Sequence, residues 1–504
     1  MPSPRVLLLF PPHLRGTEPP IGIAILKASL EQCGCIVRAW DANAAFLHWM
    51  IDRAQDCSEH RFHRAYLRRH DIIRDLRDRS TYADIGKYRS PVESLAGLMA
   101  ADARRSGVYL TPGDFESPQL PDLSFESVSN AIASHEISYF HDFIEDSLGE
   151  MVAAFNPGLI GISTIFRTQF PCALAMIGWL RACRPDIRLI IGGTYLDALP
   201  PDSITVLRDS AVEVFRGPAE SDLPRLLGFP DSSVAYHAPD YRDVHWEQYL
   251  TPQPVLPLTI SRGCYYGRCS FCDESRREYR ETQVEEVLAR STGESTPVEK
   301  PIIHFTDNAI PPGALSRLAA CEVAGGWYGF VRPEKRLTDP GFVEALARGG
   351  CRMLQLGLET PVQRLLDQMR KHTDAADFPL ILKNLRQFGI RSYVYLMFGL
   401  PGQTVEDCEA TLTFLERHPI DFINASVFQL PAGADLARNP EVYQVTISDP
   451  GRPGSRQIRY ETRDGLSRRD LRRWMGTVFS KHPAAARLLH RTPRFFKSSH
   501  AVFM

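Results

Sequence analysis

The sequence has almost no net charge and no long apolar segment. Its 58 Lys and Arg residues nearly balance its 60 Asp and Glu residues, which gives a formal net charge of −2. This balance argues against a protein that binds nucleic acid through overall charge. The longest early apolar run, residues 6–10, ends at Pro11, and no run approaches the roughly 18 residues that a membrane span needs. We therefore expect a cytoplasmic protein with neither a membrane nor a nucleic-acid partner.

Internal repeats and low-complexity tracts are also missing, and the composition is that of a folded globular chain. Hydrophobic residues make up 44% and charged residues 23% of the 504 residues, which excludes a disordered or collagen-like protein. The eleven cysteines are an odd number, and no export signal precedes them. In a reducing compartment this argues against a disulfide framework. A cluster among these cysteines instead suggests a metal centre.

The N-terminal half alternates strand-like and helix-like segments. Short apolar runs at 5–10, 36–40, 159–163, 188–191 and 212–215 each end in a Gly, Pro or polar turn. This order predicts a doubly wound, Rossmann-like parallel sheet with its ligand at the carboxyl ends of the strands. The boundaries we expect are 1–44 and 151–230 for this domain, a mainly helical insertion at 45–150 and a linker at 231–255.

A second alternating series begins near residue 256. It contains six candidate strands, at 257–261, 302–306, 326–332, 353–359, 392–399 and 422–429, with helical stretches between most of them. Six such units fit a full or partial (β/α) barrel at 256–440, with its chemistry at the carboxyl ends of the strands. Residues 441–504 are expected to form a helical C-terminal region that includes an amphipathic helix after Ser467.

Three cysteines lie within nine residues directly after the first strand of this second series. They are Cys264, Cys269 and Cys272, on a loop that contains Gly267. Three local thiolates can hold a 4Fe-4S cluster and leave one iron open to another ligand. The alternatives are a structural zinc with a distant fourth ligand and cysteines that bind no metal.

With this triad the chain resembles the radical S-adenosylmethionine (radical SAM) enzymes that carry an N-terminal cobalamin-binding domain. The resemblance implies three cofactors, a 4Fe-4S cluster, S-adenosyl-L-methionine and cobalamin. The usual spacing in that superfamily is Cys-x3-Cys-x2-Cys, and this chain has one more residue in the first gap. Gly267 can accommodate that residue.

Further segments resemble the superfamily in the expected order and imply contacts with S-adenosylmethionine. Phe271 occupies the aromatic position before the last cysteine, Asp307 ends the second strand and Arg332 ends the third. The segment 355–360 resembles the Gly-x-Glu motif of the fourth strand, and 397–404 resembles the Gly-Leu-Pro-Gly-x-Thr segment of the fifth. The contacts that these two motifs imply are Gly357, Glu359, Gly399 and Pro401.

Gly-rich turns in the N-terminal half resemble the turns of cobalamin-binding domains. They allow the backbone to approach a large planar ligand closely. No Asp-x-His-x-x-Gly motif is present, so we expect no histidine as the lower ligand of cobalt. The implied cobalamin contacts are Pro12, Ser163, Thr164, Gly192, Gly193, Thr194, Gly217 and Glu220.

The first hypothesis for function is a cobalamin-dependent radical SAM methyltransferase. It would place a methyl group on an unactivated carbon of a natural-product intermediate or a peptide precursor. The expected partners are that small-molecule or peptide substrate and a reductant such as flavodoxin or ferredoxin. The alternatives are a cyclase or rearrangement enzyme with the same cofactors and, from another class, a non-catalytic protein stabilised by zinc.

Overall fold

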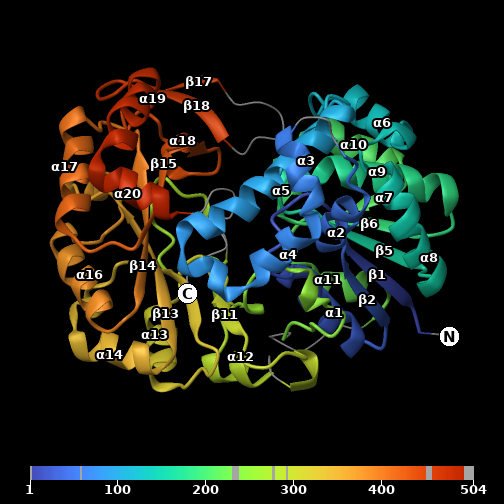
Figure 1. Cartoon of the computed structure of the whole chain (residues 1–504), viewed down its shortest axis with the longest axis horizontal. Coiled ribbons are helices and arrows are strands. Elements are labelled where there is room, and N and C mark those ends of the chain that lie inside the picture. The colour runs from blue at the N-terminus through green and yellow to red at the C-terminus, as the bar shows by residue number, and fades with distance from the viewer. Residues whose placement is uncertain are drawn as a thin grey trace. The chain divides into compact units, whose positions relative to one another are not determined.

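The computed structural model describes residues 3–56, 60–229, 238–274, 278–290, 293–449 and 457–492. The chain divides into two compact units, shown in Figure 1. The first consists of Met1–Pro254 with Arg290–Val298, and the second of Val255–Ala289 with Glu299–Met504. Among the described residues, no helix is both long and apolar enough to cross a membrane.

The first unit is built on a five-stranded sheet with the order β2-β1-β5-β6-β7. All of its neighbouring strands are parallel. Counted within the sheet, this is the order 2-1-3-4-5 of flavodoxin-like doubly wound folds. The expected fold class is confirmed for this unit. The strands are β1 (Arg5–Phe10), β2 (Ile36–Asp41), β5 (Leu159–Ser163), β6 (Arg188–Gly192) and β7 (Val212–Val214).

Helices pack on this sheet because its strands are apolar on both faces. Residues 6–10 of β1 are all buried, as a central parallel strand requires. Helix α9 is apolar around most of its circumference and is almost entirely buried. The helices that connect the strands are α1 (Ile21–Gln32), α9 (Phe170–Cys183), α10 (Pro201–Asp209) and α11 (Ala219–Leu226).

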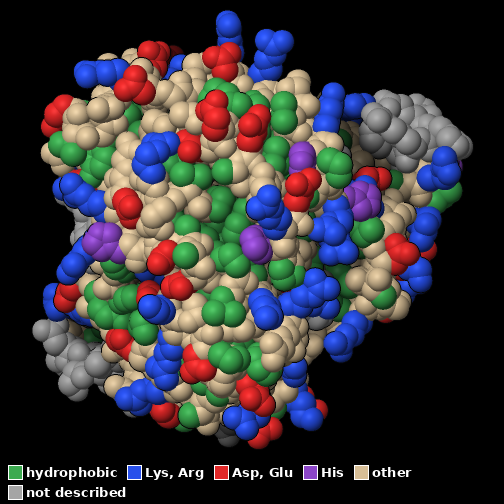
Figure 2. Space-filling view, turned by 90° about the vertical axis from the view of Figure 1, so that its left-hand side faces the viewer, with side chains coloured by type: hydrophobic (Ala, Val, Ile, Leu, Met, Phe, Trp, Pro, Cys, Tyr) green, Lys and Arg blue, Asp and Glu red, His purple; other side chains and the backbone are tan. Residues whose placement is uncertain are grey.

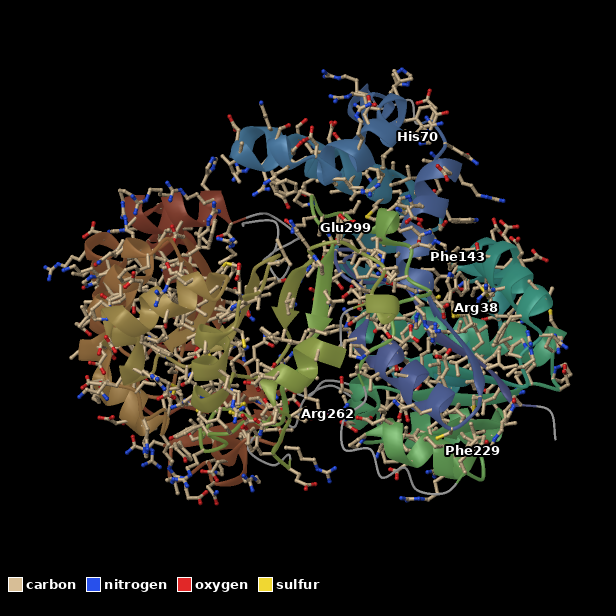
Figure 3. All side chains as sticks on the ribbon, turned by 90° about the horizontal axis from the view of Figure 1, so that it is seen from below. Arg38, His70, Phe143, Phe229, Arg262 and Glu299 are labelled. Atoms are coloured by element: carbon tan, nitrogen blue, oxygen red, sulfur yellow. The ribbon has the colours of Figure 1, made fainter. Side chains whose placement is uncertain are left out.

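The segment between β2 and β5 is largely helical, with one short hairpin. An aromatic cluster forms its core, in which the ring centroid of Phe46 lies 5.2 Å from those of both Phe140 and Phe143 (Figure 3). The hairpin turns at Pro112-Gly113 and was not expected from the sequence. The elements are α2 (Ala42–Arg53), α3 (His60–Leu67), α4 (Arg69–Arg77), α5 (Ile85–Arg105), β3 (Tyr109–Thr111), β4 (Asp114–Glu116), α6 (Phe125–Ala133), α7 (His141–Phe143) and α8 (Gly149–Phe155).

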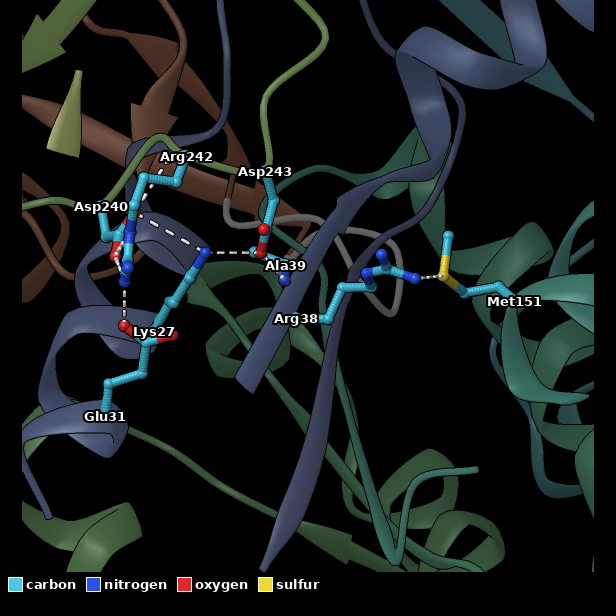
Figure 4. A network of polar contacts seen from close by, with 8 residues as sticks. All are labelled: Lys27, Glu31, Arg38, Ala39, Met151, Asp240, Arg242 and Asp243. Atoms are coloured by element: carbon cyan, nitrogen blue, oxygen red, sulfur yellow. Dashed lines mark hydrogen bonds and ion pairs between the residues drawn. The ribbon is translucent and has the colours of Figure 1, made fainter. Parts of the chain in front are cut away.

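Residues 238–250, which the sequence predicts to be part of a linker, belong to the first unit and pack on α1 and β2. Lys27 is buried on α1, and its Nζ lies 2.6 Å from Asp243 and 3.6 Å from Asp240 (Figure 4). Asp243 also accepts a hydrogen bond of 2.9 Å from the backbone N–H of Ala39 on β2. This segment therefore satisfies a backbone donor at the edge of the sheet.

The second unit contains a sheet of six parallel strands with the order β15-β14-β13-β12-β11-β8. The two end strands, β8 and β15, do not pair with each other, so the structure is a partial rather than a closed barrel. The expected fold class is confirmed here as well. The strands are β8 (Val255–Leu258), β11 (Ile302–Phe305), β12 (Trp327–Val331), β13 (Cys351–Glu359), β14 (Arg391–Phe398) and β15 (Phe422–Val427).

Helices lie between most of these strands, and three more described helices follow β15. Helix α17 begins with a capping box between Thr404 and Asp407. Near the C-terminus, the Thr492 hydroxyl donates a hydrogen bond to the carbonyl of Ile423 on the edge strand β15. The helices are α12 (Val284–Arg290), α13 (Pro312–Ala320), α14 (Pro340–Arg348), α15 (Gln363–Gln368), α16 (Phe378–Gln387), α17 (Val405–Arg417), α18 (Asp435–Arg438), α19 (Arg468–Thr477) and α20 (Pro483–Arg491).

The C-terminal region contains the expected amphipathic helix, α19, together with strands that the sequence analysis did not predict. A three-stranded antiparallel sheet lies before α19, with the order β16-β18-β17. Its strands are β16 (Leu430–Pro431), β17 (Val445–Asp449) and β18 (Gln457–Thr462). Only Tyr460 is buried on β18, and Val445 on β17. Both strands nevertheless alternate apolar and polar residues, as in Gln-Ile-Arg-Tyr-Glu on β18, so a local strand signal was present that the prediction did not use.

Candidate functional site

The three cysteines lie on the loop that follows β8 and the two-residue strand β9 (Ser261–Arg262). The side chains of Cys264, Cys269 and Cys272 are half-buried. Gly267 lies between the first two and has φ = 57°, a left-handed conformation that suits glycine. The backbone N–H of Cys272 donates to the carbonyl of Cys269 at 3.3 Å. The first gap therefore contains a left-handed glycine, and a backbone hydrogen bond closes the second gap.

Asp307 fixes the start of this loop. Its carboxylate is buried after β11 and accepts hydrogen bonds from the backbone N–H groups of Ile260 and Ser261 and, at 2.6 Å, from the Ser261 hydroxyl. Burial raises the pKa of the Asp307 carboxyl, and these donors counteract the effect. The side chain is therefore engaged in positioning the loop.

Arg332 at the end of β12 points to the same loop. Its Nη1 lies 3.6 Å from the Sγ of Cys269, and its guanidinium stacks 3.6 Å from the ring centroid of Tyr266. It also donates to the carbonyl of Lys371 and, through Nε, to Glu334 at 3.3 Å. Arg332 is only 4% exposed. A fully buried cation is thus in contact with one of the three thiols.

A buried ion pair lies beside this arginine. The Nζ of Lys371 is 2.8 Å from Oε1 of Glu359, at the carboxyl end of β13, and both side chains are almost fully buried. Glu359 has φ = 65°, and Arg370 and His372, on either side of Lys371, both have φ = 52°. Left-handed non-glycine residues carry a conformational cost and are concentrated at functional sites. Their concentration here marks this pair as part of a candidate site.

Phe271 and Gly357 lie close to this pair. The Nζ of Lys371 is 5.7 Å from the ring centroid of Phe271, a distance within cation–π range. Gly357 is buried two residues before Glu359, and a Cβ added there would lie 3.0 Å from the Lys371 Nζ. The structure thus brings Phe271, Arg332, Gly357 and Glu359 together around Lys371 and Cys269.

The segment after β14 is held by its own glutamine and by the C-terminal region. The Oε1 of the buried Gln403 accepts from the backbone N–H groups of Gly399, at 2.6 Å, and Leu400. The carbonyl of Gly399 accepts from the Tyr460 hydroxyl at 2.7 Å. Pro401 is buried in the same turn. Gly399 and Pro401 therefore lie at the carboxyl edge of the sheet, with Tyr460 over their turn.

The chemistry of the donors fits an iron–sulfur cluster, although the thiols are not gathered around one point. Burial raises the pKa of the Cys269 thiol and raises that of Cys272 to about 12, while Lys371 and Arg332 oppose the shift at Cys269. Thiolates are the ligating form, so metal binding must displace these protons. Among the described residues, no three Cys, His, Asp or Glu side chains lie close enough together to hold a metal ion.

A second candidate site lies at the carboxyl edge of the sheet in the first unit. Strand order reverses between β1 and β5, and ligands of doubly wound folds bind at such a switch point. The buried Gln169 joins the two strand ends, since its Nε2 donates to the carbonyl of Pro11 at 2.8 Å and its Oε1 accepts from the N–H of Ile165. Pro12 is buried in the β1 loop, and Ser163 ends β5.

Thr164, after β5, and Gly193, after β6, lie in close contact. The Thr164 backbone N–H and hydroxyl both donate to the carbonyl of Gly192, at 2.8 and 3.1 Å. Gly193 has φ = 104°, and a Cβ there would lie 2.1 Å from the carbonyl oxygen of Thr164. No other residue fits at this position. Thr194 follows and is exposed.

This edge has features that suit a large, partly apolar ligand. Ile165 and Phe166 are 36% and 54% exposed directly after β5. The Tyr195 hydroxyl is buried and, among the described residues, has no hydrogen-bond partner. Gly217 is exposed after β7, and Glu220 lies on α11, where its backbone carbonyl accepts from Ser29. Apolar surface together with an unsatisfied donor fits a corrin-type group.

Sequence reasoning missed three residues of these sites, Lys371, Gln169 and Gln403. A single Lys or Gln in a polar loop carries no periodic signal. Gln403 lies within the segment 397–404 that resembles the fifth-strand motif, but its bonds to the Gly399 and Leu400 amides could not be read from that motif. Gln169 gave no signal, because it bonds backbone groups that only the fold brings near.

These features define an α/β protein with a thiol-bearing loop at the carboxyl edge of a partial barrel. Residues 258–415 match the family model of the Radical SAM superfamily. The second unit thus carries a radical SAM domain, and the recognition made from the motifs is confirmed.

Curated relatives include the bacteriochlorophyllide d C-12(1)-methyltransferase of Chlorobaculum tepidum. It is 24% identical over 234 residues, which cover 43% of this chain and 49% of that protein. A ribosomal protein uS12 methylthiotransferase, RimO of Saccharopolyspora erythraea, is 27% identical over 37% of this chain and 42% of its own length. The chain thus spans about half the length of these curated relatives or less.

Solved structures with a similar fold include cobalamin-dependent enzymes. The radical SAM methyltransferase TsrM from Kitasatospora setae, with cobalamin and a 4Fe-4S cluster bound, matches with a TM-score of 0.51 and 15% identity, over 89% of this chain and 82% of that one. The enzyme OxsB with aqua-cobalamin and S-adenosylmethionine bound matches with a TM-score of 0.57 and 12% identity, over 92% and 65%. At these identities the likeness concerns the fold.

Proposed function

We propose that this protein is a cobalamin-dependent radical SAM methyltransferase. The observation that carries the proposal is the cysteine loop at the carboxyl edge of the radical SAM domain, whose Cys269 contacts the buried cation Arg332, which in turn donates to the carbonyl of Lys371. The methyltransferases among the curated relatives and TsrM among the structures of similar fold support the reaction type.

In this proposal Cys264, Cys269 and Cys272 hold a 4Fe-4S cluster, whose open iron supplies the site for reductive cleavage of S-adenosylmethionine. Glu359 is the carboxylate for the ammonium group of S-adenosylmethionine, and Phe271 is the aromatic side chain beside the adenine. The buried Arg332 and Lys371 offset the negative charge of three thiolates in a site of low dielectric constant. Asp307 and Gln403 hold the two loops in place.

Cobalamin is assigned to the carboxyl edge of the first unit. Its contacts in the proposal are the strand-end residues Pro12, Ser163, Thr164, Gly192, Gly193 and Thr194, with Gly217 and Glu220 after β7. The exposed side chains of Ile165 and Phe166 provide apolar surface beside them. Cobalamin supplies the methyl carrier of the reaction.

The substrate is proposed to be a natural-product intermediate or a peptide precursor with an unactivated carbon. Tryptophan is bound as substrate in another structure of TsrM, which shows that an enzyme of similar fold acts on a small molecule. A flavodoxin or ferredoxin would supply electrons.

The test is an anaerobic assay for 5′-deoxyadenosine and S-adenosylhomocysteine, with and without cobalamin, on protein reconstituted with iron and sulfide. Both products are expected only with cobalamin, together with a substrate mass gain of one CH2. Deoxyadenosine without a mass gain across substrates would favour a cyclisation or rearrangement instead. Bound zinc, with no iron–sulfur absorption and with neither product formed, would refute the proposed enzymatic function.

A pair of variants tests which unit holds which cofactor. Cys269→Ala is expected to abolish the iron–sulfur absorption and leave cobalamin bound. Cys321→Ala, which removes a half-buried thiol outside the loop, is the matched control and should keep both cofactors. Loss of cobalamin with retention of iron in Cys269→Ala would contradict the assignment.

A further inference from the structure

Helix α19 presents three arginines on one exposed face. Arg469, Arg472 and Arg473 are all exposed, whereas Leu471 and Trp474 on the opposite side are buried. Residues three and four apart lie next to each other on a helix surface. We call these three arginines the α19 basic face.

The charge of this face is not balanced within the helix. Asp470, the one acidic residue of α19, is engaged with the helix cap, since its carboxylate accepts from the Ser467 hydroxyl at 2.6 Å and its backbone N–H donates to the same hydroxyl at 3.1 Å. In the part of the chain that the structure describes, none of the three arginines forms an ion pair.

Elsewhere on this unit, exposed arginines do find acidic partners. Arg364 pairs with Asp407 at 2.6 Å, and Arg370 pairs with Asp435 at 3.1 Å. Basic and acidic side chains are also interspersed over most of the face shown in Figure 2. Like charges three or four residues apart destabilise a helix. The three arginines therefore destabilise α19, and no acidic side chain among the described residues compensates for this.

The inner side of α19 packs on the strand ends that surround the cysteine loop. Trp474 lies 5.7 Å from the ring of Phe398 at the end of β14. The backbone N–H of Phe428 bonds to the carbonyl of Phe398 at 2.7 Å, and the Phe428 ring lies 6.4 Å from that of Phe271. Since Phe271 directly precedes Cys272, only two aromatic neighbours separate this helix from the loop.

We propose that the α19 basic face is the docking surface for an acidic electron-carrier protein, which delivers the electron that the 4Fe-4S cluster needs. The inference rests on the proposed function. In the step, the reduced carrier loses one electron and the cluster charge falls from 2+ to 1+, with no bond made or broken. Arginine forks suit carboxylates, and a field of one sign accelerates the encounter with an oppositely charged partner.

A protein carrier fits this surface better than an acidic stretch of a substrate. The face lies on the outside of the helix, and the carrier needs to come only near the loop. A substrate must reach the reacting atoms themselves. Arg487 and Arg491 on α20 and Lys481 between the helices are also exposed, which extends positive charge beyond the three arginines.

The experiment compares two double variants of the reconstituted full-length protein. Arg472→Glu/Arg473→Glu reverses two charges of the α19 basic face. Lys383→Glu/Arg386→Glu on α16 makes the same charge change at two exposed positions on another helix of the same unit. The probes are reduced flavodoxin and, as a small reductant that needs no docking, dithionite. Cluster bleaching is followed by anaerobic stopped flow at low and high salt.

We expect the α19 variant to lose about tenfold or more of its rate with flavodoxin at low salt, with the difference vanishing at high salt. Its rate with dithionite and its iron content should match the wild type, and the α16 variant should keep its flavodoxin rate. The proposed docking surface would be contradicted if the α19 variant kept its flavodoxin rate, if both variants lost that rate equally, or if the α19 variant lost its dithionite rate to the same extent. A higher KM for substrate with a normal flavodoxin rate would assign the face to substrate. A wild-type protein without a reducible cluster would overturn the proposed function as well.

Discussion

His13 shows how one buried side chain links the stability of the first unit to pH. It is 2% exposed, and its Nε2 lies 2.6 Å from the carbonyl of Thr111. Burial lowers the pKa of His13 to about 4. In the unfolded chain this histidine becomes protonated below about pH 6.5, whereas in the folded chain it stays neutral down to about pH 4. The folded state is therefore fully stabilised at neutral pH and loses stability as the pH falls from 6.5 to 4.

We expect this histidine to account for about 3 kcal/mol of the free energy of unfolding lost between pH 6.5 and 4. In His13→Gln, which keeps a donor for Thr111 but does not titrate, that part of the pH dependence should be absent. Urea unfolding of both proteins across this range measures the difference. Parallel pH profiles for wild type and variant would show that His13 does not titrate abnormally.

The Glu359–Lys371 pair is the second prediction at the residue scale. Lys371→Met leaves the Glu359 carboxylate buried without its cation, so the free energy of unfolding should fall by about 3–5 kcal/mol. The double variant Glu359→Gln/Lys371→Met removes both charges and should recover most of that loss. Urea unfolding followed by tryptophan fluorescence gives the values for Lys371→Met, for Glu359→Gln alone and for the double variant. Losses that simply add would mean that the two side chains do not interact.

At the scale of elements, the attachment of residues 238–250 to α1 and β2 depends on Lys27. Its side chain is 3% exposed and meets Asp240 and Asp243, while Arg242 binds both Asp240 and Glu31 (Figure 4). Because Asp243 remains partly exposed, we expect Lys27→Met to cost roughly 2–3 kcal/mol, below the range for a fully buried pair.

Arg38→Met is the matched control for that prediction. Arg38 lies on the neighbouring strand β2, where it is exposed and its Nη1 lies 3.6 Å from the sulfur of Met151. Its removal should change stability by less than about 0.5 kcal/mol. Hydrogen exchange of the Ala39 amide should rise in Lys27→Met alone. Equal effects of the two substitutions would show that the buried pairing does not hold this segment.

At the scale of the whole molecule, the two compact units should respond to different cofactors. At a concentration of cobalamin 100 times its Kd, a unit that binds it only when folded gains about 2.7 kcal/mol. We expect cobalamin to slow hydrogen exchange at the ends of β1, β5 and β6 without changing β13, in the wild type and in Cys269→Ala alike. Protection of β13 by cobalamin would contradict the division of cofactors between the units.

Most strands could be predicted because their pattern is local. The parallel strands are short, buried apolar runs bounded by turns, so β11 and β13 fall within a residue or two of their predicted positions. β17 and β18 also carry a local pattern, an alternation of apolar and polar residues that the prediction of a helical region overlooked. The hairpin β3–β4 was missed because strands of three residues are too short for any alternation to show.

The candidate site divides in the same way. Cys264, Cys269 and Cys272 could be found because their spacing is itself the signal. The contacts of Asp307 and Lys371 could not be predicted from the sequence, because each side chain binds a partner that lies far from it along the chain. Ser261 is 46 residues from Asp307, and Glu359 is 12 residues from Lys371.

The sequence by itself determined the two alternating α/β series, the cysteine loop and the family, since periodicity and motif spacing are properties of neighbouring residues. Only the tertiary structure decided which charges are paired and which are left exposed. It joins Lys27 to Asp243 and Glu359 to Lys371, and it leaves the arginines of α19 without acidic partners among the described residues. The reason is physical, because an ion pair forms where packing brings two side chains together, and that packing follows from the whole fold.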